Sequence, residues 1–218
     1  MQKFTLFILF ILGSIIVLTL SPLLDQQLAI LPYNSYTHQF YGEGAWWCRI
    51  IYYAVSLVSI CLVATPLIYW WCNRNNVAKQ FLVRRMIFIT YLSLAIGPGL
   101  VVNASFKQNW GRARPYQVIR DHHQFTLPWQ PQFNQPLYNS FPSGHVSIGA
   151  FIGIPFLAIR RRRLGVGLCV AGFIIVGLVR YLQGGHYFSD ICLAALIVWM
   201  VNLLVTHLVD KYFLVKWK

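Results

Sequence analysis

Charged residues are scarce in this sequence. They make up 11% of its 218 residues, whereas hydrophobic residues make up 57%. A soluble domain carries about 25% charged residues, so this chain cannot cover a soluble surface. The shortage is greatest for acidic residues, with 5 Asp and Glu against 18 Lys and Arg. Together with a mean hydropathy of +0.56, it predicts an all-α integral membrane protein with a single domain, 1–218.

Cysteine pairs of the CxxC type are also missing. The five cysteines lie mostly within or beside apolar runs, at Cys48, Cys61, Cys72, Cys169 and Cys192. This pattern argues against a zinc site or a disulfide framework. We interpret them as small apolar residues without a functional role.

Apolar runs long enough to cross the ~30 Å hydrocarbon layer of a bilayer can be placed six times. They fall at 4–23, 50–71, 86–106, 143–159, 164–183 and 190–209. We therefore expect six transmembrane helices, of which the fourth is short. Gly97-Pro98-Gly99 should bend or loosen the third. The first run exceeds the usual length of a signal peptide core and no clear small-x-small site follows, so we favour a retained span.

The distribution of lysine and arginine predicts the orientation. Twelve of the 18 lie on one side of these spans, including four consecutive arginines, 160–163. That side should be cytoplasmic. Both termini are then inside, and 24–49, 107–142 and 184–189 face out. Because topology accounts for most of the positive charge, we expect no nucleic-acid partner.

Cations nevertheless gather in the outer segment 107–142. They are Lys107, Arg112, Arg114 and Arg120. Ordinary juxtamembrane charge is one explanation, but cations are scarce on this side. A cluster retained here favours anion binding, because arginine makes bidentate phosphate contacts and lysine supplies a point charge. Pro115 should hold Arg114 in an extended backbone.

Pro142-Ser143-Gly144-His145 stands where a polar loop meets the fourth apolar run. Proline suits the first turn of a helix, so we expect the span to begin here. Free N–H groups near Ser143 and Gly144 would then point outward and suit a phosphate. His145 would lie one step deeper. Taken alone, such a histidine is more often a structural hydrogen-bonding group than a catalyst.

The third unusual segment runs from Arg180 to Asp190. Arg180 lies near the end of an apolar span, where an ionisable group needs a partner or a function. His186 and Asp190 are four residues apart, so on a helix they would share a face. Asp190 could then accept a hydrogen bond from one imidazole nitrogen and orient the other toward a substrate. A structural His–Asp pair and a metal site are the alternatives.

Together these segments resemble the signature of the type 2 phosphatidic acid phosphatase superfamily. The resemblance rests on Lys107 separated by six residues from Arg114-Pro115, on Pro142-Ser143-Gly144-His145, and on the spacing from Arg180 through His186 to Asp190. It covers about half of the chain. One position departs from the family pattern, because Val179 stands where the family usually has serine.

The resemblance implies six spans and metal-independent catalysis through a phosphohistidine, with no cofactor. By position, His186 would attack phosphorus with help from Asp190, and His145 would protonate the leaving oxygen. The remaining signature residues would hold the phosphate, namely Lys107, Arg114, Ser143, Gly144 and Arg180. This agrees with the general demand of phosphoryl transfer for positioning and charge stabilisation.

Six spans point to a lipid phosphate in the bilayer as the substrate, and no obligate protein partner is inferred. The segment from Phe106 to Arg112 and the loop with Trp129 are similar to the branch acting on lipid A phosphates. That would place the enzyme in a bacterial inner membrane, with its site facing the periplasm. Undecaprenyl pyrophosphate or phosphatidylglycerophosphate phosphatases and a lipid phosphotransferase remain alternatives. A non-catalytic lipid-phosphate binding protein is a further one.

Overall fold

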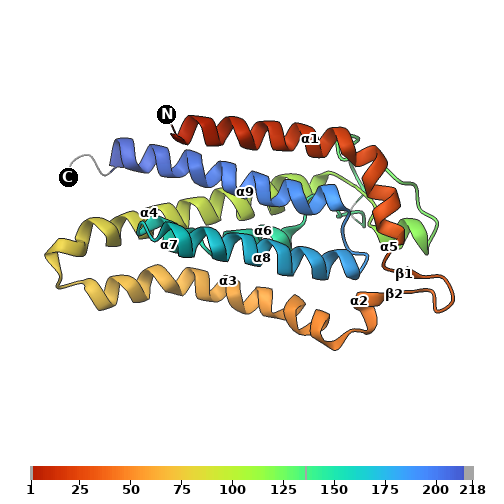
Figure 1. Cartoon of the computed structure of the whole chain (residues 1–218), viewed down its shortest axis with the longest axis horizontal. Helices are drawn as coiled ribbons and strands as arrows, with labels where there is room; N and C mark the ends of the chain where they lie inside the picture. Colours follow the sequence, from red (N-terminus) through yellow and green to blue (C-terminus); the bar gives the residue numbers. More distant parts are fainter. Residues whose placement is uncertain (1, 136, 214–218) are drawn as a thin grey trace.

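Apolar helices run side by side along the length of the molecule (Figure 1). The computed structural model describes residues 2–135 and 137–213, so Lys216 and Lys218, which we expect to be cytoplasmic, lie outside the described residues. The helices are α1 (Gln2–Ile30), α2 (Tyr41–Gly44), α3 (Trp46–Asn73), η1 (Val77–Lys79), α4 (Gln80–Leu94), η2 (Ala95–Lys107), α5 (Pro115–Ile119), α6 (Gly144–Phe151), α7 (Ile154–Ala158), α8 (Arg162–Leu182), α9 (Phe188–Leu208) and η3 (Val209–Phe213). The strands β1 (Tyr33–Asn34) and β2 (Gln39–Phe40) pair antiparallel.

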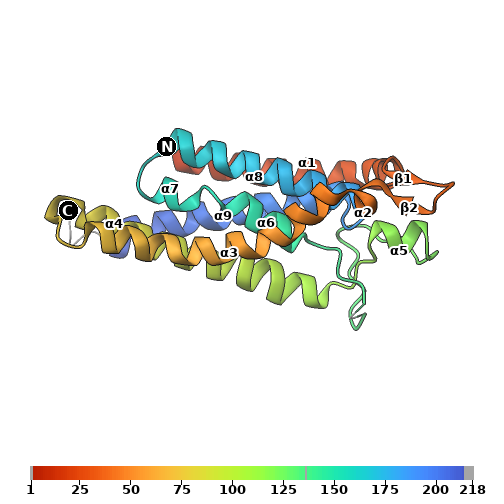
Figure 2. The same ribbon diagram turned by 90° about the horizontal axis from the view of Figure 1, so that it is seen from below.

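The two ends of the bundle carry different parts of the chain. Helix α1 begins and α9 ends at one end, where the α3–α4 and α7–α8 connections also lie (Figure 1). The β1–β2 hairpin, α2 and α5 lie at the other end, and the view turned by 90° agrees (Figure 2). The segments 24–49, 107–142 and 184–189 therefore share the end that we predict to face out.

Among the described residues, five helical segments are long and apolar enough to cross a membrane. They are Thr5–Ile30, Trp46–Asn73, Val77–Lys107, Arg162–Leu182 and Phe188–Tyr212. The predicted fourth span is instead a shorter apolar stretch, Gly144–Ala158, made of α6 and α7. Pro155 explains the break, because it cannot donate a hydrogen bond to the carbonyl four residues earlier, at Phe151, where α6 ends.

The predicted loosening of the third span is present. Helix α4 gives way at Ala95 to the π-helix η2, which contains Gly97-Pro98-Gly99. Pro98 lacks an N–H, and the side chain of Asn103 donates to the Pro98 carbonyl at 2.6 Å. The wider helix ends at Lys107, so it sets the position of that ammonium group at the end that we predict to face out.

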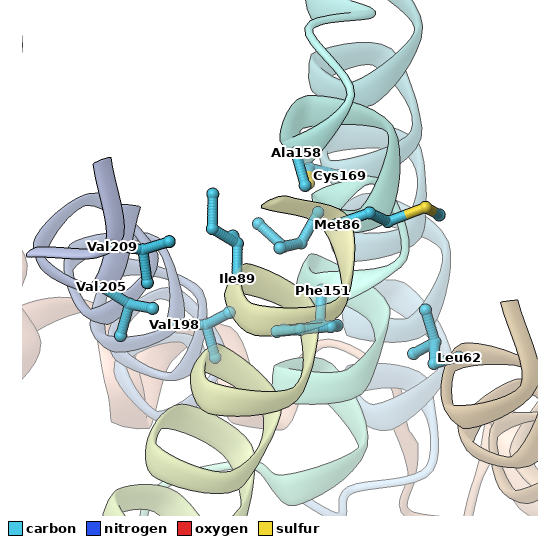
Figure 3. Packing of buried hydrophobic residues seen from close by; sticks show 10 residues of the cluster. Leu62, Met86, Ile89, Phe151, Ala158, Cys169, Val198, Val205 and Val209 are labelled. Carbon is cyan, nitrogen blue, oxygen red and sulfur yellow. The ribbon is translucent and has the colours of Figure 1, made fainter. Parts of the chain in front are cut away.

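Two apolar clusters hold the bundle together. The larger joins α3, α4, α6 and α9, where Phe151, Ile89 and Val198 pack within one group of buried side chains (Figure 3). The smaller cluster includes Val146 and Ile191. In the sequence, these two residues directly follow the predicted site residues His145 and Asp190. Dense packing of this kind fixes the first turns of α6 and α9 relative to each other.

A partly buried ion pair lies at the end of the bundle where α1 begins. Arg85 of α4 binds Asp210 of η3 through Nε–Oδ1 at 2.8 Å and Nη2–Oδ2 at 3.1 Å. Its Nη1 also donates to the Leu157 carbonyl at 3.3 Å and to the Ala158 carbonyl. Arg85 thus satisfies the carbonyls at the end of α7, which is far from the outer end of the molecule.

Candidate active site

The predicted site residues come from elements that meet at one end of the bundle (Figure 1). They lie at the end of η2, before α5, at the start of α6, at the end of α8 and around the start of α9; they are Lys107, Arg114, Ser143, Gly144, His145, Arg180, His186 and Asp190. Segments up to 83 residues apart in the sequence therefore share one small region.

The imidazole of His186 is held in one tautomer. Its side chain is 1% exposed, and Nδ1 lies 2.6 Å from the Ser140 carbonyl oxygen. A carbonyl oxygen can only accept, so Nδ1 carries the hydrogen and Nε2 carries the lone pair. Among the described residues, Nε2 has no hydrogen-bond partner. The free lone pair makes Nε2 the nucleophilic atom of this ring.

Asp190 does not accept the predicted hydrogen bond from His186. Its Oδ2 is 3.9 Å from Nδ1 and instead accepts from the Ser140 hydroxyl at 2.5 Å and from the Tyr187 amide at 3.0 Å. The prediction assumed that both residues lie on one helix, but α9 begins at Phe188, after His186. Asp190 therefore orients the imidazole through Ser140.

Three cations surround the two histidines. Lys107, Arg114 and Arg180 all interact electrostatically with His186 and with His145. Burial and then these three charges lower the pKa of His186 well below 6.5, against the hydrogen bond to the Ser140 carbonyl, which raises it. His186 is therefore neutral at physiological pH.

None of these three cations has a carboxylate partner in residues 2–135 and 137–213. Arg180 donates to the Gln183 side chain at 2.7 Å, and Arg114 donates to Asn139 Oδ1 at 2.6 Å. Arg180 is 5% exposed, and its Nε has no hydrogen-bond partner. Such buried positive charge is unfavourable unless an anion neutralises it.

The first turn of α6 faces the same region. Helix α6 begins at Gly144, with Ser143 as the N-cap whose Oγ accepts from the Val146 amide at 3.4 Å. The Ser143 amide is not free as predicted, because it donates to the Asp190 carbonyl at 3.3 Å. A Cβ on Gly144 would come 2.5 Å from Asn103 Oδ1 and 3.3 Å from Lys107 Nζ. Lysine 107 therefore lies against the bare backbone of Gly144.

Tyr52 of α3 contacts two of the predicted site residues. Its ring stacks on His145 with centroids 4.4 Å apart and an interplanar angle of 23°. The Arg180 guanidinium lies 5.0 Å from the centroid of the same ring. Sequence reasoning missed this residue, because nothing in its apolar surroundings distinguishes it from a lipid-facing aromatic.

A pocket of about 270 Å³ opens beside this region. Its walls come from α2, α3, α5 and α8 and include Arg114, Arg180, Glu43, Arg49 and Tyr53. The wall thus contains two of the three unneutralised cations together with polar groups outside the family signature.

Two of the four cations that we expected to bind an anion have other partners. Arg112 is 0% exposed and forms ion pairs with Asp25 at 2.8 Å and with Asp190. Arg120 lies at the surface, 3.3 Å from Glu43 and 3.2 Å from Asp121. The anion-binding prediction is therefore wrong for Arg112 and Arg120, because their charges are already balanced.

The protein is a mostly helical bundle in which a neutral histidine lies beside three cations that have no carboxylate partner among the described residues, and such a site suits an anionic group such as phosphate. The family model described as "PAP2 superfamily" matches residues 86–213. The chain also resembles the lipid A 4'-phosphatase of Francisella tularensis subsp. novicida (strain U112), with 36% identity over 196 residues that cover 82% of this chain and 83% of that protein. The chain belongs to the PAP2 superfamily. No solved structure gives a significant match.

Proposed function

We propose that this protein removes a phosphate from a lipid of the lipid A type, presented from the outer leaflet, through a phosphohistidine intermediate on His186. The lone pair on His186 Nε2, beside three cations without carboxylate partners among the described residues, carries this proposal. Membership of the PAP2 superfamily and the similarity to a lipid A 4'-phosphatase support a membrane lipid phosphatase.

The first half of the reaction forms one bond and breaks another. His186 Nε2 attacks phosphorus while the bond from phosphorus to the lipid oxygen breaks, and His145, which the bound phosphate anion keeps protonated, gives that oxygen a proton. The phosphoryl group is then bound to Nε2, and Nδ1–H stays on the Ser140 carbonyl. In the second half His145 takes a proton from water, whose oxygen attacks phosphorus while the bond from phosphorus to Nε2 breaks. This step returns the lone pair to Nε2 and releases inorganic phosphate.

The phosphate oxygens would meet positive charge in three directions. Lys107, Arg114 and Arg180 balance the charge on the equatorial oxygens, and the first amides of α6, at Gly144 and His145, have no intrahelical acceptor. Pre-positioned donors of this kind are the main source of rate enhancement in phosphoryl transfer. We propose that the reaction needs no metal ion, because side-chain cations supply this stabilisation.

The proposed function includes an orientation of the spans and of the site in the membrane. We propose six spans, with α6 and α7 as the fourth, both termini in the cytoplasm and the site facing the periplasm of a bacterial inner membrane. The cation bias of the loops supports this orientation. The pocket beside Arg114 and Arg180 would hold the headgroup that carries the phosphate. The acyl chains would remain in the bilayer.

Phosphate release from a panel of lipids tests this function. Purified protein in detergent, with EDTA present, should release phosphate from lipid A faster than from phosphatidylglycerophosphate, undecaprenyl pyrophosphate or phosphatidic acid. His186→Ala should abolish release, whereas the loop variant His123→Ala, which alters an exposed histidine bonded to Tyr138, should not. An active His186→Ala variant would contradict the mechanism, and label transferred to a second lipid would indicate a phosphotransferase.

A further inference from the structure

Arg112 is the most completely bonded charged side chain near the candidate site. Its guanidinium donates through Nε to the Thr126 carbonyl at 2.9 Å, through Nη1 to Ser189 Oγ at 3.0 Å and to Asp190 Oδ1, and through Nη2 to Asp25 Oδ2 at 2.8 Å. The side chains of Arg112, Asp25 and Asp190 are all 0% exposed. One buried guanidinium thus joins two buried carboxylates.

Asp25 brings a fourth part of the chain to this cluster. It lies near the end of α1, and it accepts from the Ser189 amide at 2.9 Å and from the Ser189 hydroxyl at 2.5 Å. Ser189 is in the first turn of α9, next to Asp190. Helix α1 packs along α9, so Asp25 fixes the start of α9 to α1 through the two bonds from Ser189.

The charges of this cluster do not cancel. Arg112 alone would neutralise Asp190, but Asp25 adds a second carboxylate and leaves one net negative charge. Asp190 Oδ2 is 3.9 Å from His186 Nδ1. Both residues bond to Ser140, Asp190 to its hydroxyl and His186 to its carbonyl oxygen. When Nε2 bonds to phosphorus, the imidazole becomes positively charged. A fixed negative charge behind the ring is therefore more favourable in the transition state than in the ground state.

We infer that Asp25, Arg112 and Asp190 form a buried ion triad that positions the His186 imidazole, and that Asp25 supplies the negative charge that Arg112 would otherwise cancel. This inference rests on the proposed function. Asp25 and Arg112 are positioning residues, because neither contacts the phosphate site. Helix α1 is accordingly part of the catalytic support as well as a membrane span.

Steady-state kinetics of Asp25→Asn on the best lipid of the panel test the charge. We expect kcat to fall about tenfold or more, as misplacement or lost stabilisation at a reacting group does. KM should not rise, because losing a negative charge does not weaken the binding of an anionic substrate. Asp25→Glu, which restores the charge, should recover part of kcat. Arg112→Lys keeps the charge but cannot reach both carboxylates, so it should also lose kcat.

The pair Arg85–Asp210 provides the matched control. It is a partly buried arginine–aspartate pair at the opposite end of the bundle, and Asp210→Asn should lower the melting temperature while kcat and KM stay within about twofold of wild type. All rates are taken per folded molecule, measured on the monodisperse fraction. If the Arg112 variants do not fold, the two Asp25 variants carry the test.

The outcomes separate the two claims. A wild-type enzyme that releases phosphate, together with an Asp25→Asn variant of unchanged kcat, would overturn the triad and leave the proposed function standing. A kcat loss equal to that of Asp210→Asn would also overturn it, because the effect would then be general destabilisation. A wild-type protein that acts on none of the lipid phosphates would overturn both. A selective loss of kcat with recovery in Asp25→Glu supports the triad.

Discussion

Arg112 and Arg114 stand two residues apart in one loop, and their guanidinium groups meet opposite surroundings. Arg112 lies between Asp25 and Asp190 and has no exposed surface. Arg114 bonds to the neutral side chain of Asn139 and lies in electrostatic range of Lys107. The first region has more negative than positive charge, and the second has cations without a carboxylate among the described residues.

The charge of Arg112 therefore stabilises the fold, whereas the charge of Arg114 is available to bind a substrate. Breaking a buried ion pair leaves an uncompensated charge and is costly. Cations gathered without carboxylates are unfavourable in the free protein, and an arriving phosphate removes this cost. Stability should therefore fall when the arginine of the first region is removed, and stay equal or rise when an arginine of the second region is removed.

The largest expected effect comes from Arg180→Gln. Removing one cation that stabilises transition-state charge should lower kcat/KM by about 10²–10³, whereas the melting temperature in detergent should stay equal or rise. Arg112→Gln should instead lose about 3–5 kcal/mol of unfolding free energy. Thermal unfolding and phosphate release, measured on both variants, check this contrast. A large loss of stability in Arg180→Gln would contradict it.

Inorganic phosphate should stabilise the protein by binding to Lys107, Arg114 and Arg180. A ligand that binds only the folded state adds about 2.7 kcal/mol at a concentration of 100 times its dissociation constant. We therefore expect the melting temperature to rise with phosphate in the wild type and to rise much less in Arg114→Gln. Chloride at equal ionic strength is the control, and an equal response to both anions would remove the argument for a phosphate site.

How far the sequence predicts this site depends on whether its signals are local. Lys107, His145 and Arg180 stand where apolar runs meet polar loops, so their positions alone indicated a shared outer end. The broken fourth span could also have been foreseen from Pro155, which lies inside its apolar run. The predicted hydrogen bond from His186 to Asp190 was wrong, because the prediction placed His186 on the same helix as Asp190. The helix begins two residues after His186, at Phe188.

The ion triad has no local signal at all. Asp25 follows an apolar run and precedes Arg112 by 87 residues, so only the packing of α1 on α9 brings them together. Arg112 lies near other cations in the sequence, so its sequence context predicts that it binds an anion together with them. Tyr52 was missed for the same reason, because its contacts with His145 and Arg180 depend on three separate helices.

A smaller effect on kcat/KM is expected from a substitution in the first turn of α6, at Gly144. In Gly144→Ala, the added methyl group would press on Asn103 and Lys107. Moving one phosphate-binding cation by a few tenths of an ångström should lower kcat/KM by about tenfold. Gly44→Ala is the matched control, because no atom lies within 4 Å of the position that its Cβ would take. Equal activity of the two variants would show that Lys107 needs no close approach to the backbone.

The smallest effect is the pH dependence that the unpaired cations impose on His186. Its pKa in the folded protein is well below 6.5, first through burial and then through Arg180, Arg114 and Lys107. Below pH 6.5 the unfolded chain binds a proton at this residue that the folded protein does not. The free energy of unfolding therefore decreases as pH falls below 6.5, and above pH 6.5 this loss of stability is absent.

His186→Gln removes this titration and retains a neutral side chain. Between pH 7.5 and 5.5 the wild type should lose about 1 kcal/mol more unfolding free energy than the variant. All other residues are the same in both proteins, so the difference isolates His186. Chemical unfolding in detergent at several pH values measures it. Equal pH dependence in the two proteins would mean that the cations do not suppress protonation of His186, and the contrast with the charge-balanced Arg112 region would lose its electrostatic basis.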